Sequence, residues 1–323
     1  MLAAYRERYC EPGQVGVAER PVKEPGPGEI RCRVVVTTVN RSDVALVTGR
    51  PAVMRLMAGL NRPRRPIPGT DFAGVVEKVG PQVTRFRVGD RVVGFEDNGC
   101  SSQAEFLILG PSAPVAHIPL GISYESAVAG MEGGHYAINF LNKVHLQAGQ
   151  SALVYGASGA IGSALVQLLK PVGVRVTAVC GPDGLEAVGS LKPDDLLNHQ
   201  ETNLTDLPYR YDYIFDAVGK RTFGELKSLL KPGGIYISSE LGPGGQNLFL
   251  PLITRIGGGR RVVFPFPSDI PHSLNLLCQE LAAGRYHPLI DREYPISQVG
   301  SAYDYVASGR KLGSVLLRMS GEL

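Results

Sequence analysis

The sequence predicts a two-domain α/β protein, in which a domain of short strands comes before a parallel sheet covered by helices. The length of 323 residues suggests about two domains. The first third of the chain carries short β-branched runs separated by turns, which is typical of a small β-barrel or sandwich. The middle third alternates strand-like runs with stretches of helical spacing, which is typical of a doubly wound parallel sheet.

The predicted strands of the first domain follow Pro/Gly turns. The run Ile30–Val39 is rich in β-branched residues and comes after a turn at Pro25–Gly28, and Phe72–Val79 comes after Pro68-Gly69. Two shorter runs continue the pattern at Arg91–Phe95 and Phe106–Leu109.

The second domain is predicted from a strand–helix–strand unit. Ser151–Tyr155 and Arg175–Cys180 are apolar runs on either side of Ala160–Val172, where apolar residues recur at helical spacing. Further strands are predicted at 213–215, 235–238 and 261–264. The end of the chain predicts helices at 273–283 and 299–307, an extended segment at 286–296, and a final strand at 314–318 that can return to the first domain.

Composition and charge exclude several classes of protein. A hydrophobic content of 44% and a charged content of 20% are ordinary for a globular protein, and a net charge of +3 gives no argument for a nucleic-acid or membrane partner. The five cysteines form no C-x-x-C pair, which argues against a disulfide framework. Neither a signal peptide nor a long apolar span is evident. We therefore expect a cytoplasmic protein with a small-molecule partner.

The strongest functional signal is a glycine-rich segment between the predicted strand and helix of the second domain. It reads G-x-x-G-x-x-G, whereas the standard dinucleotide motif is G-x-G-x-x-G. Such glycines let the backbone approach a pyrophosphate at a helix N-terminus, where free N–H groups and the helix dipole favour anions. A purely structural turn is the alternative. We predict a dinucleotide site in a Rossmann-type sheet, formed by Gly156, Ser158, Gly159, Ala160, Ile161 and Gly162.

The end of the second strand predicts which dinucleotide binds. An NAD site places an acidic residue there, about 20 residues after the glycines, to bind the ribose 2′-OH. Cys180 and Gly181 occupy this place, and Asp183 comes after Pro182 as a turn residue. Because no carboxylate there would repel a 2′-phosphate, we predict NADPH, with Cys180 and Gly181 near the ribose. No basic partner for the phosphate is evident in the neighbouring sequence.

Six segments, in order, carry a resemblance that spans nearly the whole chain. They are Pro25–Ile30 (P-x-P-G-E-V), Asn40–Asp43 (N-x-x-D), Pro68–Val76 (P-G-x-D-x-A-G-x-V), Val88–Val92 (G-D-R-V), Asp216–Gly219 and Leu230–Gly234. With the glycine-rich segment, they resemble the medium-chain dehydrogenase/reductase superfamily, and the pattern is most similar to its zinc-free quinone oxidoreductases.

The resemblance implies a domain organisation and further cofactor contacts. It implies a GroES-like β-barrel catalytic domain, which we place at residues 1–121 and 267–323, and a Rossmann cofactor-binding domain at residues 122–266. Ala217, Val218 and Gly219 would run past the cofactor, and Phe264 would line the nicotinamide pocket. The resemblance also implies a homodimer.

Zinc ligands of the superfamily are replaced in this chain. Zinc-dependent members carry Cys and His-Glu at two of the segments above, where this chain has Asn40 and Thr70-Asp71. Protein zinc sites are built from thiolate, imidazole and carboxylate ligands, so we predict no metal. Without a metal to polarise an alcohol, we predict hydride transfer from NADPH to an electron-poor acceptor, namely a quinone or an α,β-unsaturated carbonyl.

Asn40 and Thr70 are the candidate catalytic residues, because each offers a polar group for the nicotinamide or the substrate oxygen. The alternative is that Asn40 caps a turn and Thr70 is structural, as we predict for Asp43. A non-catalytic NADPH-binding protein and an alcohol dehydrogenase of the same superfamily remain alternative functions. The arginines between residues 50 and 65 are predicted to form a solvated loop, with a lid as the alternative.

Overall fold

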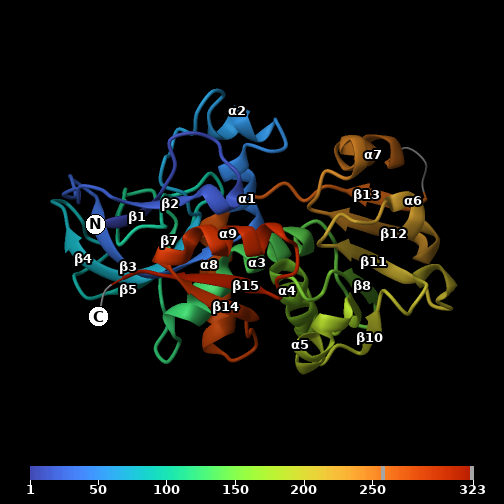
Figure 1. Ribbon diagram of the computed structural model, residues 1–323. Coiled ribbons are helices and arrows are strands. Elements are labelled where there is room, and N and C mark those ends of the chain that lie inside the picture. Colours follow the sequence, from blue (N-terminus) through green and yellow to red (C-terminus); the bar gives the residue numbers. More distant parts are fainter. Residues whose placement is uncertain (256–258, 321–323) are drawn as a thin grey trace. The chain divides into compact units, whose positions relative to one another are not determined.

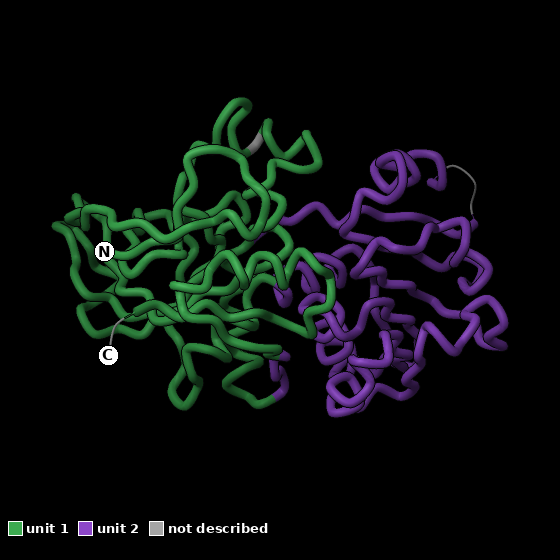
Figure 2. The backbone as a smooth tube through the Cα atoms, in the orientation of Figure 1, with its two compact units in different colours: residues 1–132, 270–284, 290–323 green, residues 133–269, 285–289 purple. Residues whose placement is uncertain are grey.

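The computed structural model describes residues 1–255 and 259–320, and the chain divides into two compact units (Figure 2). Unit 1 holds residues 1–132, 270–284 and the chain from 290 onward, and unit 2 holds residues 133–269 and 285–289. The first boundary falls inside a continuous helix, α3 (Tyr124–Leu141). The domain limits at 121 and 266 follow a change of sequence pattern, whereas these units follow spatial contacts.

Unit 1 is built on a seven-stranded sheet (Figure 1). The strand order is β14-β15-β3-β4-β5-β7, and β6 also pairs with β3. The pairings are antiparallel apart from the parallel pair β14 and β15. The bounds are β3 (Ile30–Val39), β4 (Asp71–Val79), β5 (Arg91–Phe95), β6 (Phe106–Leu109), β7 (Val115–His117), β14 (Ile290–Pro295) and β15 (Ser314–Arg318).

The last strand returns to the first domain, as the sequence predicts. β15 pairs with β3 in the register Val315↔Val39 to Arg318↔Val36. A separate antiparallel pair is formed by β1 (Leu2–Tyr5) and β2 (Gly16–Glu19). The helices of this unit, besides the first part of α3, are α1 (Arg41–Thr48), α2 (Met54–Ala58), α8 (Ile270–Ala282) and α9 (Val299–Ala307).

The core of unit 1 joins the sheet to α9. Inward side chains of the strands, such as Val34, Phe72 and Val92, are buried together with Tyr303 and Val306 of α9. Alternating inward and outward side chains are what a sheet with one covered face requires. This packing fixes the end of β3, after which Asn40 is the N-cap of α1.

Unit 2 is a six-stranded parallel sheet with the strand order β10-β9-β8-β11-β12-β13. Numbered along the chain from β8, this is the order 3-2-1-4-5-6 of the doubly wound dinucleotide fold. The bounds are β8 (Ser151–Tyr155), β9 (Arg175–Cys180), β10 (Asp195–Asn198), β11 (Tyr211–Asp216), β12 (Leu230–Ser238) and β13 (Arg261–Val263). The helices are the rest of α3, α4 (Ala160–Leu169), α5 (Leu185–Ser190), α6 (Phe223–Leu226) and α7 (Gln246–Thr254).

The sheet order places a switch point between β8 and β11, which lie side by side while their connections leave in opposite directions. Ligands of this fold bind at the carboxyl ends of the strands at such a point. The two-domain α/β fold, with a GroES-like and a Rossmann domain, is therefore the predicted one.

Some predicted elements differ in length. The helix expected over Ala160–Val172 ends as α4 at Leu169 and continues as a 3-10 turn, Lys170–Val172, because Pro171 has no N–H for the α-helical ladder. Of the extended segment at 286–296, only Ile290–Pro295 is a strand.

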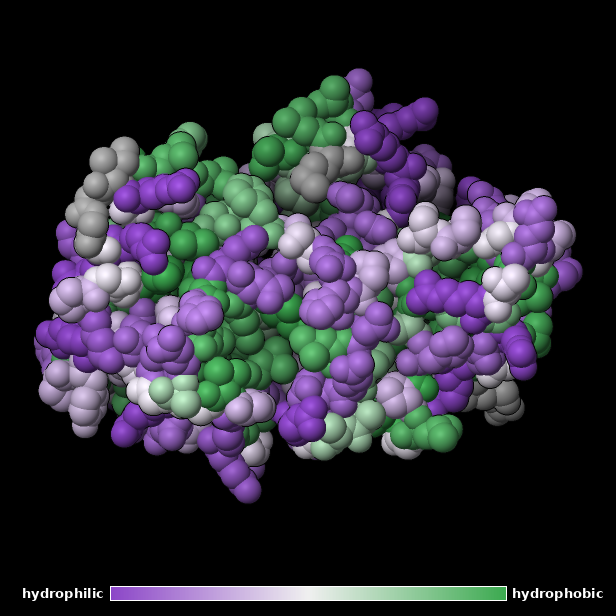
Figure 3. All heavy atoms as spheres, turned by 180° about the vertical axis from the view of Figure 1, so that it is seen from behind, coloured by the Kyte–Doolittle hydropathy of each residue, from purple (hydrophilic) through white to green (hydrophobic). Residues whose placement is uncertain are grey.

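One face of the molecule can be followed in Figure 3. Hydrophilic residues cover much of the face shown in Figure 3, and hydrophobic residues are interspersed among them. Among the described residues, no helix combines the length and the apolar character that crossing a membrane would need.

Candidate functional site

The glycine loop (Gly156–Gly162) joins β8 to α4 at the switch point of unit 2. The N–H groups of Gly156 and Ala157 both donate to Val179 O of the neighbouring strand, at 3.0 Å each, which fixes the start of the loop. α4 then begins at Ala160 with Gly159 as its N-cap, and no side chain caps it. The first N–H groups of a helix have no intrahelical partner, so this helix end can receive an anion.

The three glycines of the loop are required for different reasons. A Cβ on Gly156 would lie 2.0 Å from a methyl carbon of Val218, and one on Gly162 would lie 2.2 Å from Gly156 O. The Gly162 contact is with backbone, and Gly156 also has a φ of +82°, so the fold itself demands these two glycines. Gly159 has an ordinary φ of −79°, and a Cβ there would meet only Gly156 O, at 3.5 Å. The described chain leaves open the space in front of Gly159.

The predicted residues Ala217, Val218 and Gly219 lie beside this loop. Ala217 N donates to Tyr155 O at 3.0 Å. The buried Asp216 carboxylate accepts hydrogen bonds from the N–H groups of Val218 (3.0 Å) and Gly219 (2.8 Å), and from the Tyr236 hydroxyl (2.7 Å). Burial raises the pKa of Asp216, against the effect of these donors. Sequence reasoning missed Asp216 as the residue that shapes this segment, although it opens the Asp216–Gly219 motif.

The end of β9 carries Cys180 and Gly181, as predicted, and a neighbour that the sequence did not suggest. Burial raises the pKa of the Cys180 thiol. His199, just after β10, donates its backbone N–H to Cys180 O at 3.0 Å, and a Cβ on Gly181 would lie 3.4 Å from its Nε2 atom. Asp183 is exposed in the 3-10 turn Pro182–Gly184. Parallel pairing of β9 with β10 brings in this imidazole.

Phe264 follows β13, the edge strand of the sheet, and β12 lies between β13 and β11. Its ring is 4.8 Å from that of Phe266, centroid to centroid. The structure thus places Phe264 at the carboxyl ends of the strands, with β11 and β12 between its strand and β8, the strand that leads into the glycine loop.

Asn40 and Thr70, far apart in sequence, are brought together in unit 1. Both are buried, and Asn40 Nδ2 donates to Thr70 Oγ1 at 2.8 Å. Asn40 is also the N-cap of α1: its Oδ1 accepts from Asp43 N at 2.7 Å, and Asp43 accepts in return from Asn40 N at 3.1 Å. This capping box satisfies N–H groups at the helix start. Asn40 therefore has both predicted roles. Its side-chain oxygen caps α1, and its side-chain N–H group donates to Thr70.

Of the two residues, Thr70 has a hydroxyl hydrogen that can donate to a substrate. Its hydroxyl oxygen accepts from Asn40, and no side-chain acceptor for its own hydrogen occurs within residues 1–255 and 259–320. A hydroxyl held by one hydrogen bond and free to donate a second can stabilise negative charge on a substrate oxygen.

Two buried carboxyl groups lie behind the pair. Asp71 accepts from Thr38 N (2.8 Å), Thr38 Oγ1 (2.7 Å) and Thr37 Oγ1 (3.2 Å). Burial raises the pKa of Asp71 to about 6 despite these hydrogen bonds. Burial, with Asp71 nearby, also raises the pKa of Asp43 well above its usual value. Asp43 thus occupies the structural place at the start of α1 that the sequence predicts.

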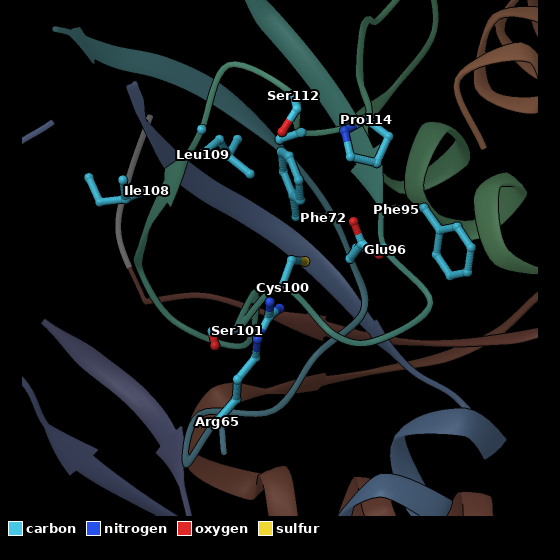
Figure 4. A pocket seen from close by; sticks show the side chains of 12 residues that line it. Arg65, Phe72, Phe95, Glu96, Cys100, Ser101, Ile108, Leu109, Ser112 and Pro114 are labelled. Atoms are coloured by element: carbon cyan, nitrogen blue, oxygen red, sulfur yellow. The ribbon is translucent and has the colours of Figure 1, made fainter. Parts of the chain in front are cut away.

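A separate half-open cavity of about 310 Å³ lies in unit 1 (Figure 4). Arg65, Glu96 and Cys100 line it, together with apolar side chains such as Phe72 and Leu109, and no predicted site residue does. Figure 4 shows the Arg65 guanidinium extending toward Cys100, yet burial raises the pKa of that thiol to about 12. In the 50–65 segment, Arg50 pairs with Glu11 at 2.8 Å on the surface and Arg55 lies over the Tyr9 ring.

The described residues contain no group of three or more His, Cys, Asp or Glu side chains placed to hold a metal ion. At the position of the predicted pair, the donors are an amide and a hydroxyl, which are poor zinc ligands.

Comparisons with known proteins cover both units. The pattern of the alcohol dehydrogenase GroES-like domain matches residues 26–136, and that of the zinc-binding dehydrogenases matches residues 191–317. The chain is 28% identical to a 2-methylene-furan-3-one reductase of Solanum lycopersicum, covering 93% of this chain and 74% of that protein.

Two more relatives and a solved structure are also similar to this chain. The chain is 26% identical to the chloroplastic NADPH-dependent alkenal/one oxidoreductase of Arabidopsis thaliana, covering 92% and 73% of the two chains. It is 27% identical to the quinone oxidoreductase of Pseudomonas aeruginosa, covering 91% and 92%. The Escherichia coli quinone oxidoreductase, solved with NADPH, has the same fold, with a TM-score of 0.81 at 20% identity over 98% of this chain and 100% of that chain.

Proposed function

Because the chain belongs to the medium-chain dehydrogenase/reductase superfamily, in its quinone oxidoreductase-like branch, we propose that it is an NADPH-dependent oxidoreductase. Its acceptor is a quinone or an α,β-unsaturated carbonyl, and the reaction uses no zinc. The names of its relatives support this acceptor class, since they include a quinone oxidoreductase and reductases of enones.

Gly159 is the observation that carries the proposal. The fold explains Gly156 and Gly162 by contacts of 2.0 and 2.2 Å, but nothing in the described chain requires a glycine at 159. An uncapped helix N-terminus with open space in front of it is what a pyrophosphate needs. The backbone of Ser158, Gly159, Ala160, Ile161 and Gly162 would hold the pyrophosphate, with the 217–219 segment beside it. When bound, NADPH supplies the hydride.

The choice of NADPH over NADH rests on the end of β9. Cys180 and Gly181 carry no charge that would repel a 2′-phosphate, and Asp183 is exposed in the following turn. The His199 imidazole beside Gly181 supplies a hydrogen-bond donor for that phosphate. The Arg221 guanidinium, which lies near Tyr155 at the end of β8, adds positive charge to the same edge of the sheet.

The role of unit 1 is to bind and polarise the acceptor. Asn40 holds Thr70 through its amide N–H at 2.8 Å, and the Thr70 hydroxyl donates to the acceptor oxygen, where negative charge develops during reduction. A preorganised donor of this kind stabilises the transition state more than the ground state. Asn40 is thus a positioning residue and Thr70 the catalytic one.

Phe264, the domain limits at 121 and 266, the pairing of two copies and the cytoplasmic location remain predictions. Light scattering on the purified protein measures the number of copies, and microscopy of a tagged chain reports its location. One relative named above is chloroplastic by name.

The experiment that tests the function is an acceptor panel with NADPH. Purified protein is mixed with quinones, enones, saturated ketones and alcohols, and absorbance of the nicotinamide is followed. We expect turnover with quinones or enones and none with saturated ketones. NADPH binding without turnover of any acceptor would favour a non-catalytic NADPH-binding protein, and turnover confined to alcohols with NADP⁺ would favour an alcohol dehydrogenase.

A further inference from the structure

Reduction of an enone or a quinone needs a proton as well as a hydride, and the Asn40–Thr70 pair does not ionise to provide one. Of the two carboxyl groups next to the pair, Asp43 is committed to the capping box at the start of α1, where it accepts from Asn40 N. Asp71 is committed to three hydrogen bonds from Thr37 and Thr38. The remaining titratable groups of unit 1 are therefore the side-chain candidates for the proton donor.

Glu132 of α3 is a half-buried carboxyl group beside the start of α1. Ser42, two residues after Asn40, donates its hydroxyl to Glu132 Oε1 at 2.8 Å. Burial raises the pKa of Glu132 to about 7. Asp43, Asp71 and Asp97 are the acidic groups that face it, so a negative charge on Glu132 is opposed from several elements.

Lys311 is the positive group that faces Glu132. It precedes β15 and donates a hydrogen bond from Nζ to Gly313 O. Its positive charge lowers the pKa of Glu132 and partly offsets burial. Burial lowers the pKa of Lys311, with Arg41 and Asp291 as the other charges around it. A carboxyl group held between opposing effects near neutral pH is suited to general acid catalysis.

We propose that Glu132 is the proton donor of the reaction, held in place by Ser42 and tuned by Lys311. The inference rests on the proposed function. Hydride addition to the β-carbon of an enone leaves the former double-bond electron pair on an enolate, whose oxygen faces Thr70. The O–H bond of Glu132 then breaks, its proton goes to the α-carbon, and the enolate electron pair forms the new C–H bond. Water reprotonates the carboxylate, and the acceptor has gained a hydride and a proton.

The test uses the full-length protein, NADPH and a cyclic enone with an α-methyl group, whose reduction creates a stereocentre at the α-carbon. In Glu132→Gln, we expect kcat to fall about 100-fold. The enantiomeric excess of the product should fall toward zero, because bulk water then protonates either face of the enolate. NADPH affinity, titrated without acceptor, should stay unchanged. Glu125→Gln on the same helix, whose carboxylate pairs with Arg318, is the matched control.

Two further measurements separate proton donation from a structural role. Lys311→Met removes the charge that favours the Glu132 carboxylate, so the acid form should persist, and the fall of kcat with rising pH should move to higher pH. Infrared difference spectra of the acceptor-free protein should show a protonated carboxyl band at neutral pH that Glu132→Gln lacks.

The outcomes distinguish the two proposals. If wild-type protein reduces the enone and Glu132→Gln keeps its kcat, pH profile and product stereochemistry, the proton-donor assignment is overturned and the function stands. If wild-type protein reduces no enone or quinone, both are overturned. Loss of NADPH affinity or of thermal stability in Glu132→Gln equal to the loss of kcat would reduce Glu132 to a structural residue.

Discussion

The glycine loop of unit 2 presents backbone to its surroundings, whereas the Asn40–Thr70 pair of unit 1 presents side chains that are already bonded to each other. The loop consists of seven consecutive residues that form the proposed pyrophosphate site. Contacts within the fold explain two of its three glycines. In the pair, the residues come from the start of α1 and the segment before β4, and Asn40 serves both a helix cap and a neighbour.

This difference determines how each region responds to mutation. The loop separates fold from binding, because Gly162 is needed for the first and Gly159 only for the second. In the Asn40–Thr70 pair, fold and function are coupled. A change at Asn40 removes both the cap of α1 and the hydrogen bond that positions Thr70.

The largest effect is expected at Thr70. Thr70→Val keeps the shape but removes the hydroxyl, and the loss of a donor to a developing oxyanion lowers kcat by about 10²–10³-fold. It also leaves the Asn40 N–H without its acceptor, which costs about 1–3 kcal/mol of stability. Thr70→Ser is the matched control and should keep most of the activity in steady-state assays. Equal kcat in Thr70→Val and wild type would remove Thr70 from the chemistry.

The next effect sharpens the contrast within the loop. Gly159→Ala should weaken NADPH binding at least tenfold, about 1.4 kcal/mol, while leaving the melting temperature unchanged, because its Cβ meets only Gly156 O at 3.5 Å. Gly162→Ala should lower the melting temperature, because its Cβ would lie 2.2 Å from Gly156 O and such overpacking costs about 1–3 kcal/mol. Fluorescence titration and thermal melts check both. Unchanged NADPH affinity in Gly159→Ala would favour a purely structural loop.

A smaller effect is expected at His199. His199→Leu should reduce the preference for NADPH over NADH about fivefold, near 1 kcal/mol, through loss of a hydrogen bond to the 2′-phosphate. NADH affinity should not change, which makes it the internal control of the same titration. If the affinities for NADPH and NADH fall together, His199 stabilises the end of β9 and does not bind the 2′-phosphate.

The smallest effect concerns stability and pH. The pKa of Asp71 is raised to about 6 in the fold, above its unfolded value of about 3.9. Its contribution is therefore full below about pH 4 and lost as pH rises through about 6. In urea titrations across this window, Asp71→Asn should show a shallower loss of unfolding free energy than wild type. Asp183→Asn, at an exposed position, is the control and should keep the wild-type dependence of unfolding free energy on pH. An equally steep dependence in Asp71→Asn would contradict the raised pKa of Asp71.

The sequence predicted the loop better than the pair, for a physical reason. A phosphate cradle is local, so Gly156–Gly162 and its flanking strands are visible in consecutive residues, and the regular strand–helix alternation gives the sheet as well. The bond from Asn40 to Thr70 spans thirty positions and depends on β3 and β4 pairing, so the sequence supplied two candidates but not their contact. His199 was missed because it reaches Gly181 only through the pairing of β10 with β9. Asp216 was missed because its role is to accept hydrogen bonds from the turn that follows it. Glu132 and Lys311 are far apart in sequence, and they come near each other only because the end of the chain returns to unit 1 through β15.

The central claim is that the glycine loop of this chain binds NADPH. The most direct measurement is a fluorescence titration of the wild-type protein with NADPH and, separately, with NADH. Both nucleotides should bind, and NADPH should bind at least tenfold more tightly than NADH. Tighter binding of NADH would contradict the assignment at Cys180, Gly181 and His199, and binding of neither would make the glycine loop a structural turn and remove the basis of the proposed function.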